Sequence, residues 1–556
     1  MSVPSILIHN ASVLTMDDDC PRASAVALAG NSVLAVGGED LLSLASTGTR
    51  IIDAQGRTVL PGFNDSHLHL FIGAVGLAHL DLTHIKGVDA LRDAVRSYAA
   101  EHPDEFLLCA EFTDYSILGE GVAITRHVLD EILPDRPFVM TAFDNHTSWC
   151  NTAALKAGGI LQGRALPVGN EIVMGEDGQA TGELREADAM APVRSLSATG
   201  WREGLGMATG GDPESVTEAE RASDREILRR GLAYCAQNGV TSIQNMDGTL
   251  YTLELLEEID REIGLPVRVR VPFHCKNFTE LSEFTSRAAR WRERFTGSKL
   301  RSDFVKMFID GVTESGTAVF LGGYGDAPEE NGDPLFSQDA LNAAVAEADR
   351  LGFQVAIHAI GDGGIRMVLD AYENAACVNG RRDSRHRIEH IEVLHPADLP
   401  RFAALGVVAS MQPVHVPGAG LFGSELYLSR IGRERWPGGF PVRSLKESGA
   451  RVVYSTDWPV VPLAPMLTVK CAVCRKPWAE GLKDEALDLH ETLEAYTRAG
   501  AWVEFCEDEK GMLRPGMLAD LVMLDGDIEA VAPDAIESIA PGLTICDGVV
   551  TFSRAP

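Results

Sequence analysis

The segment from Thr58 to Gly73 reads TVLPGFNDSHLHLFIG and places two histidines, His67 and His69, one residue apart after an apolar run. Side chains at positions i and i+2 point to the same face of a β-strand, so both imidazoles should project in one direction. Histidine is the commonest protein ligand for transition metals. Taken alone, this pair fits a metal site and an ordinary pair of strand histidines equally well.

Further residues with ligand or proton-transfer chemistry fall at the ends of later apolar runs. These are Lys306 in DFVKMFIDG, His358 in FQVAIHAIGD, His390 in HRIEHIE and Asp457 in RVVYSTDWP. Each of these residues, taken alone, could have a purely structural role. Histidines in strands are more often core groups than ligands, lysines are usually solvated, and aspartates often occupy turns. Their joint occurrence at successive strand ends predicts a metal site.

The donor set indicates more than one ion. Four imidazoles and a carboxylate exceed what one four-coordinate ion with an open position needs, and they suit two ions that share a bridge. A lysine ammonium has no free lone pair, but addition of CO2 to the amine gives a carboxylate-like carbamate that can bridge two cations. We therefore expect two divalent ions, zinc or else Mn, Fe or Co, and a carbamate on Lys306.

The elements that would position these residues alternate along the middle of the chain. Apolar runs begin with the Thr58 segment and continue at 239–246, 266–274, 303–311, 353–362, 386–392, 406–413 and 451–459, with amphipathic helical stretches between them. Eight strands alternating with helices predict a (β/α)8 TIM-like barrel. Active sites of such barrels lie at the carboxyl ends of the strands, where the residues named above fall.

Both termini have a different character. Residues 1–58 and 508–556 are rich in short apolar runs and turn signals, which predicts one small β-sandwich built from the two ends of the chain. The barrel is expected over 59–507. Roughly 170 residues separate its first and second strand runs, far more than one crossover helix needs, so a subdomain is expected at 75–222.

Composition narrows the class of protein. The chain has 556 residues, 45% of them hydrophobic, and a formal net charge of −31, which argues against nucleic acid and anionic membranes as partners. We find no signal peptide and no run near the ~18 apolar residues of a membrane span. Ten scattered cysteines fit reduced thiols. We expect a cytoplasmic protein with a small-molecule substrate, and homo-oligomerisation remains open.

The motifs also resemble a known family. VLPGFNDSHLHL, VAIHAIGDGGIRMVLDAYE, RIEHIEVLHPADLPRFAALGVVASMQPVH, YSTDWPVVPLAP and GMLRPGMLADLVMLDGD are similar to segments of the amidohydrolase superfamily. The resemblance covers nearly the whole chain and is closest to the YtcJ-like branch (amidohydrolase 3), which includes N-substituted formamide deformylases. The motifs are specific for the family but not for a substrate.

The resemblance implies metal-assisted hydrolysis, usually of carbon–nitrogen bonds such as amides, formamides or cyclic amides. It assigns the metal roles to His67, His69, His358, His390 and Asp457, with Lys306 at the position of a bridging carboxylated lysine. In this scheme His67, His69 and Asp457 hold the more buried ion, and His358 and His390 hold the second. Asp457 is expected to act as general base and then as general acid.

The sequence offers several candidates for substrate binding and two alternative functions. His146 in the insert, His274 at the end of the third strand and Glu183 in ATGELRE are candidates for substrate binding, although Glu183 fits a loop salt bridge at least as well. A deaminase or lactonase of the same superfamily is an alternative, but Lys306 argues against a mononuclear deaminase. A non-catalytic binding or regulatory member would be expected to have lost ligand positions, and all are present.

Overall fold

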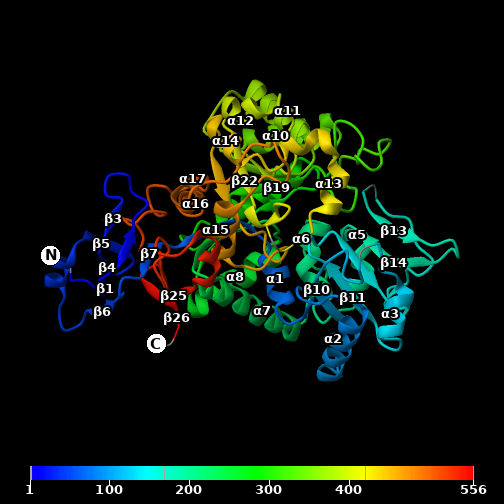
Figure 1. Ribbon diagram of the computed structural model, residues 1–556, viewed down its shortest axis with the longest axis horizontal. Helices are drawn as coiled ribbons and strands as arrows, with labels where there is room; N and C mark the ends of the chain where they lie inside the picture. The colour runs from blue at the N-terminus through cyan, green and yellow to red at the C-terminus, as the bar shows by residue number, and fades with distance from the viewer. Residues whose placement is uncertain (1–2, 120, 168, 420, 422, 555–556) are drawn as a thin grey trace.

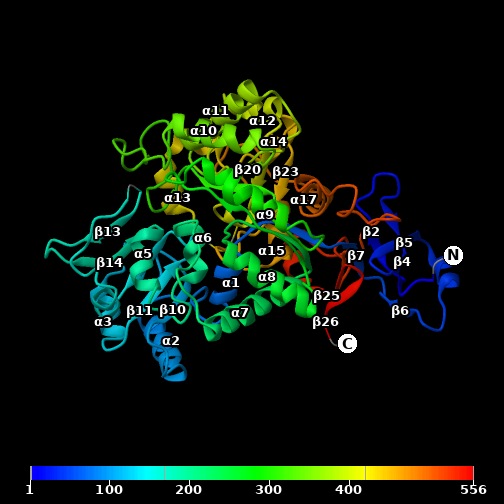
Figure 2. The ribbon, with the colours of Figure 1, turned by 180° about the vertical axis from the view of Figure 1, so that it is seen from behind.

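The computed structural model describes residues 3–119, 121–167, 169–419, 421 and 423–554. Three groups of sheets follow one another along its long axis (Figure 1). The terminal sheets lie at one end, a central α/β part lies in the middle, and the inserted sheet lies at the other end, as the view from behind also shows (Figure 2).

The central part contains parallel strands in two sheets, with the orders β18-β16-β15-β8 and β17-β19-β20-β21-β22-β23. The strands are β8 (Phe63–Leu68), β15 (Val240–Asn245), β16 (Arg268–Arg270), β17 (Phe273–His274), β18 (Leu300–Arg301), β19 (Phe304–Phe308), β20 (Gln354–Ala359), β21 (Arg387–His390), β22 (Val408–Met411) and β23 (Val452–Tyr454). Only two residues separate β16 from β17, and Pro272, which has no N–H for a ladder, is one of them. Two residues also separate β18 from β19, and β18 lies just before the predicted run at 303–311.

The first strand position lies beside the segment that follows the last one. The backbone N–H of Asp457 donates to the carbonyl of His67 at 2.8 Å, and that of His69 donates to the carbonyl of Trp458 at 2.7 Å. The buried carboxyl of Asp65 adds a side-chain link, because it accepts bonds from the Thr456 N–H and hydroxyl. These bonds bring β8 and the end of β23 together in a TIM-barrel-like arrangement.

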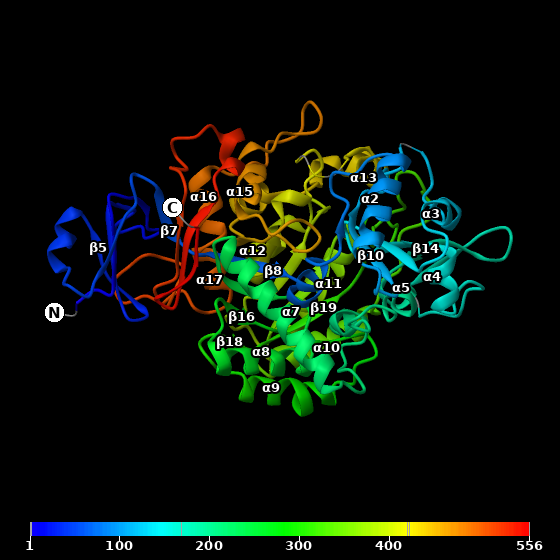
Figure 3. The same cartoon turned by 90° about the horizontal axis from the view of Figure 1, so that it is seen from below.

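Helices connect and cover the parallel strands. They are α1 (Leu70–Gly76), α7 (Glu218–Gln237), α8 (Leu250–Ile263), α9 (Ala289–Arg294), α10 (Gln338–Arg350), α11 (Asp362–Asn379), α12 (Leu399–Leu405), α13 (Glu425–Ile431), α14 (Val442–Glu447), α15 (Pro465–Cys474), α16 (Leu489–Ala495) and α17 (Arg498–Val503). Figure 3 shows α7, α8 and α9 together on one side of the central part. Helix α7 begins with a capping box between Thr217 and Glu220, and its Gly231 lets it approach α1, since a Cβ there would lie 2.6 Å from the Cβ of Ala74.

Strands from both ends of the chain pair in one sheet of order β26-β25-β24-β7-β2-β3. Its strands are β2 (Ser12–Leu14), β3 (Arg22–Ala23), β7 (Thr58–Pro61), β24 (Leu521–Leu524), β25 (Pro541–Cys546) and β26 (Val549–Ser553). A second sheet, β5-β4-β1-β6, holds β1 (Ile6–His9), β4 (Ala25–Ala29), β5 (Ser32–Gly37) and β6 (Arg50–Asp53). One apolar cluster joins side chains of both sheets, such as Ile8, Val59 and Leu521. The domain bounds themselves stay a prediction.

The long connection between β8 and β15 carries a six-stranded sheet of order β13-β14-β12-β11-β10-β9. Its strands are β9 (Leu80–Asp81), β10 (Leu108–Thr113), β11 (Phe138–Ala142), β12 (Thr147–Cys150), β13 (Glu171–Met174) and β14 (Ala180–Arg185). The helices of this segment are α2 (Val88–Glu101), α3 (Arg126–Ile132), α4 (Thr152–Ala157), α5 (Ala187–Arg194) and α6 (Leu205–Ala208). Trp149 belongs to an apolar cluster of this segment, and the partly buried Tyr115 packs against it.

The described part of the chain has neither a membrane-spanning helix nor a disulfide bond. Within residues 3–554, apart from the four internal positions that are not described, no helix has both the length and the apolar character needed to cross a bilayer. All ten cysteines are free thiols.

Candidate metal centre

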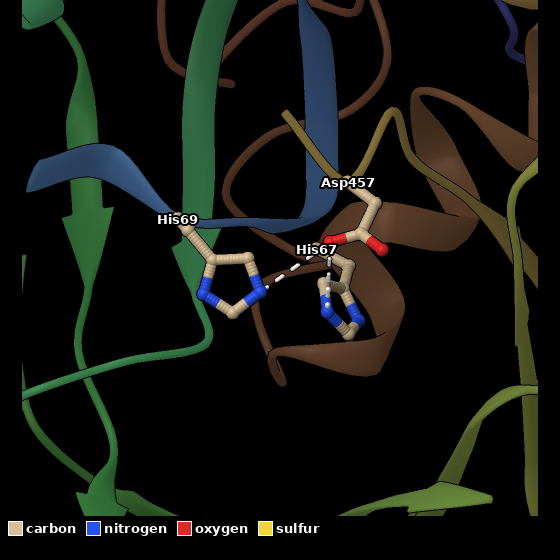
Figure 4. Close-up of side chains that lie close together, drawn as sticks. All are labelled: His67, His69 and Asp457. Carbon is tan, nitrogen blue, oxygen red and sulfur yellow. Dashed lines mark ion pairs between the residues drawn. The ribbon is translucent and has the colours of Figure 1, made fainter. Parts of the chain in front are cut away.

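His67, His69 and Asp457 converge at the carboxyl ends of the first and last strand positions (Figure 4). Both histidines point an Nε2 atom at the same oxygen of Asp457, with Nε2–Oδ1 distances of 3.3 Å for His67 and 3.4 Å for His69. All three side chains are buried. The shared orientation of the two imidazoles follows from the two-residue period of the strand, as their spacing predicts.

The ring of His67 is fixed from behind by a buried carboxylate. Its Nδ1 lies 2.7 Å from Glu389 Oε2, and Glu389 also pairs with the guanidinium of Arg387. Both Glu389 and Arg387 are fully buried. Burial by itself would raise the pKa of Glu389, but Arg387 and His67 hold it well below its usual range. The ionised carboxylate keeps the proton of His67 on Nδ1 and leaves Nε2 free as a ligand atom.

His69 has a similar carboxylate behind it. Its Nδ1 lies 3.5 Å from Asp247 Oδ2, and Asp247 follows β15 by two residues. Burial disfavours the charged form of His69, but the carboxylates of Asp247 and Asp457 outweigh it and raise the pKa to about 9. The sequence analysis missed both Glu389 and Asp247, although each lies at or just beyond the carboxyl end of a predicted strand.

His358 and His390 form the second part of the site. Their ring centroids lie 4.5 Å apart, and that of His390 lies 4.8 Å from the ring of His67. His358 Nε2 bonds to the carbonyl of Gly311, and His390 Nδ1 lies 2.9 Å from Gln412 Oε1. Burial, followed by nearby cationic groups, lowers the pKa of both histidines well below its ordinary value, so both are neutral and able to coordinate.

His415 is a site residue that the sequence analysis did not single out. It follows β22 in a short 3-10 turn, and its Nε2 lies 3.9 Å from Asp457 Oδ2. Together with His390 and Asp457 it forms a second group of potential ligands, so that Asp457 belongs to both groups. A signal was present in the sequence, because His415 lies two residues beyond the seventh predicted run at 406–413, near the strand end where barrel active sites form.

Lys306 lies under the same cluster. Its side chain is fully buried on β19, and its Nζ lies 4.4 Å from the ring centroid of Phe308 and has no hydrogen-bond partner among the described residues. Burial lowers the pKa of Lys306 to about 8. Phe308 in turn stacks on His358 with ring centroids 4.7 Å apart, and the charge of Lys306 contributes to the lowered pKa of His67, His358 and His390.

The backbone turns sharply at two of these residues. His390 has a φ of 77° and Asp457 a φ of 65°, which is the left-handed region that residues other than glycine seldom adopt. His390 ends the buried strand β21, and Asp457 lies three residues after the end of β23. Strained backbone of this kind gathers at functional sites, where the surrounding structure holds it in place.

Several buried polar atoms of the cluster have no hydrogen-bond partner among the described residues. They are His69 Nδ1, Lys306 Nζ, His358 Nδ1, His415 Nε2 and Asp457 Oδ1. Buried polar atoms are nearly always satisfied, and those left over require an explanation such as an ion. Neutral imidazoles and an ionised carboxylate are also the donors that divalent zinc and related metals prefer. The residues present therefore fit a divalent metal.

The cluster opens into a cavity. Of the three residues predicted to bind substrate, His146 lines this cavity, and His274 and Glu183 do not. Its walls include His67, His69, His146, His358, His390, His415 and Asp457. His146 pairs with Glu186 at 2.8 Å, and although burial opposes its charged form, Glu186 raises its pKa to about 9. His274 is buried and stacks on Phe308 without lining the cavity. Glu183 pairs with Arg185 on β14, so the structure does not bring it to the site.

The cavity that these histidines line also has an acidic wall. It contains Asp144, Glu314 and Glu392, none of which the sequence analysis named. Burial and the neighbouring carboxylates raise the pKa of Glu392 well above its ordinary value, and burial with Asp144 raises that of Glu314 to about 7.

The chain is similar to proteins of known family over almost its full length. It is 29% identical to the protein LONG AFTER FAR-RED 3 of Arabidopsis thaliana, with 94% of this chain and 87% of the relative covered. It is 27% identical to the N-substituted formamide deformylase of Arthrobacter pascens, with 99% and 98% covered. Among solved structures, a metal-dependent hydrolase from Pyrococcus horikoshii matches with a TM-score of 0.72 at 25% identity, covering 95% of this chain and 99% of that one.

The family model described as "Amidohydrolase family" matches residues 50–552, a span that contains every residue of the cluster. The match confirms the family expected from the sequence motifs. On this evidence, the chain belongs to the amidohydrolase family.

Proposed function

We propose that this protein is a metal-dependent hydrolase that cleaves a carbon–nitrogen bond, in an amide, formamide or cyclic amide, of a small molecule. One observation carries the proposal: two groups of potential ligands, His67–His69–Asp457 and His390–His415–Asp457, share Asp457 and line one cavity. Similarity to a formamide deformylase at 27% identity supports the bond type.

The ligand roles follow from the free ring nitrogens. His67 and His69 with Asp457 would hold one ion, and His358 and His390 would hold a second, with His415 within reach of Asp457 as a further donor. When bound, such ions supply Lewis acidity, which makes water a nucleophile near neutral pH and polarises a carbonyl group. Zinc is our first choice of metal.

Asp457 would move the proton. Burial opposes its ionisation, but His67 and His69 hold the pKa of Asp457 well below its usual range, so its side chain is an ionised carboxylate with no proton of its own. It takes one proton from the attacking water as the C–O bond forms. The same proton then passes to the leaving nitrogen as the C–N bond breaks, which yields a carboxylic acid and an amine.

A substrate panel tests this function directly. We expect the zinc- or manganese-loaded enzyme to hydrolyse at least one of a set of N-formyl amines, N-acyl amines and cyclic amides, measured by release of the acid or the amine. Hydrolysis of esters or lactones alone, or release of ammonia from amino-substituted rings, would favour the alternative chemistries. No turnover together with no bound metal would point to a non-catalytic member.

Removal of metal should abolish the activity reversibly. Dialysis against a strong chelator should leave less than about 1% of the turnover, because metal-activated water and carbonyl polarisation are both lost. Zinc or manganese should then restore it, and elemental analysis should report about two ions per chain if both ligand groups bind. Full activity in metal-free protein would rule out the mechanism.

Lys306 would bridge the ions as a carbamate. The lowered pKa of Lys306, about 8, makes neutral amine available for CO2, which adds to Nζ with loss of a proton. We expect Lys306→Ala to bind less metal, with partial recovery of metal and activity when a short carboxylic acid is added. Lys299→Ala, which removes a lysine bonded to the Leu265 carbonyl away from the cluster, is the control. Full metal occupancy in Lys306→Ala would contradict the bridging role.

A further inference from the structure

Two carboxyl side chains on the acidic wall of the site cavity have no bonding partner on another side chain. Glu392 is 7% exposed, and neither its carboxyl group nor that of Glu314 makes an ion pair or a hydrogen bond with another side chain among the described residues. The backbone carbonyl of Glu392, by contrast, accepts bonds from Tyr427 and Phe440. A buried carboxyl group that faces a cavity without a partner indicates a ligand with a donor or a positive charge.

Two positive groups that act on this wall, His146 and Arg430, are already paired with other carboxylates. His146 contacts Glu186 at 2.8 Å, and Arg430 lies 3.5 Å from Asp326. Asp144, the third acidic residue of the wall, differs from the other two because it accepts bonds from Tyr115 and the His146 N–H. Glu314 and Glu392 therefore remain as the acidic groups available to a ligand.

The lining of the cavity excludes the opposite kind of ligand. In the described part of the chain, no lysine or arginine lines this cavity, and the imidazole of His146 is paired with Glu186. A carboxylate or phosphate group at the end of a substrate remote from the metal ligands would therefore find no unpaired side-chain cation. A larger adjoining cavity of ≈ 770 Å³ shares His146, Met207 and Phe308 with it. Seven carboxyl side chains and three lysines or arginines line that larger cavity, so an approaching molecule also meets an acidic surface on this side.

We propose that the preferred substrates carry an ammonium or guanidinium group, which binds Glu314 and Glu392 while the scissile amide faces the metal ligands. This inference rests on the proposed C–N hydrolysis and names its substrate class. Charge would fix the orientation of the substrate, because a cationic group is repelled from bound metal ions and attracted by the carboxylates. The same contacts hold a product diamine until it leaves.

Three formamides of equal chain length test the preference on the metal-loaded enzyme. They are N-formyl-1,4-diaminobutane, N-formylpentylamine and 5-formamidopentanoate, whose far ends are cationic, neutral and anionic. We expect kcat/KM to be higher for the cationic compound than for the neutral one by roughly tenfold or more, the size of one charge-assisted hydrogen bond, and lowest for the anion. Equal values, or a preference for the anion, would overturn the proposal.

Single variants test whether Glu314 and Glu392 cause the preference for the cationic substrate. Glu392→Gln and Glu314→Gln should each bring the cation-to-neutral ratio of kcat/KM toward one, and Glu218→Gln, at the start of α7 and outside the cavity, should leave the ratio unchanged. Circular dichroism checks the fold of each variant. Should Glu392→Gln misfold, the partly exposed Glu314 decides the matter. An unchanged ratio in a folded Glu314→Gln variant counts against the assignment.

Calorimetry separates this inference from the proposed function. Pentylammonium should bind the metal-loaded wild-type enzyme roughly tenfold more tightly than 1-pentanol, and Glu314→Gln should remove the difference. This comparison needs no turnover. If no formamide is hydrolysed but pentylammonium still binds selectively, the reaction assignment fails and the cation site stands. If the two compounds bind equally, the cation site fails whatever the enzyme hydrolyses.

Discussion

Asp457→Asn should lower kcat by roughly 10²–10⁴-fold, the usual contribution of a positioned general base and acid. An amide side chain cannot accept the proton of the attacking water, and it is a weaker ligand than the carboxylate that belongs to both metal-binding groups. The variant should still fold, because the backbone bond from residue 457 to the His67 carbonyl does not involve the side chain.

The metal content of Asp457→Asn tells which role of the side chain causes the fall in kcat. A large fall in kcat with both ions present supports the proton-transfer role, whereas a fall that tracks loss of metal indicates a ligand role. Asp370→Asn, which changes an exposed carboxylate paired with Arg401, is the matched control and should be indistinguishable from wild type. A kcat near the wild-type value in metal-loaded Asp457→Asn would contradict the proposed mechanism.

Glu389→Gln should reduce both stability and metal affinity. The Arg387 guanidinium is fully buried, and neutralising its carboxylate partner leaves an uncompensated charge, at a cost of about 3–5 kcal/mol in the free energy of unfolding. The same change weakens the hold on His67 Nδ1, and loss of such an outer contact lowers metal affinity by roughly 10–100-fold. Denaturant unfolding of the metal-free protein and competition with a chelator measure the two effects separately.

A double variant tells the two roles of Glu389 apart. In Glu389→Leu/Arg387→Leu the buried charges disappear together, so much of the stability should return, while the support of His67 remains absent. We therefore expect near-wild-type unfolding free energy with metal affinity still reduced. Recovery of metal affinity in the double variant would show that Glu389 acts only through stability.

The clustering of His67, His69 and Asp457 could be predicted because it depends on local rules. The two-residue strand period places His67 and His69 on one face. The alternation of apolar runs with helical stretches locates the strand that carries Lys306 and the strand ends near which His358 and Asp457 lie. Family motifs added the bond type. None of these inferences needs a contact between distant segments to be known in detail.

Only the tertiary structure decided which other groups reach the site. Glu389 contacts His67 across 322 positions in the chain, and neither residue type nor spacing marks it as different from other strand glutamates. Glu183, a candidate by sequence, lies away from the cavity, while Glu314 and Glu392 line it. Which side chain faces a cavity depends on how loops from separate strands pack together, and that packing is a property of the whole fold and not of any one segment.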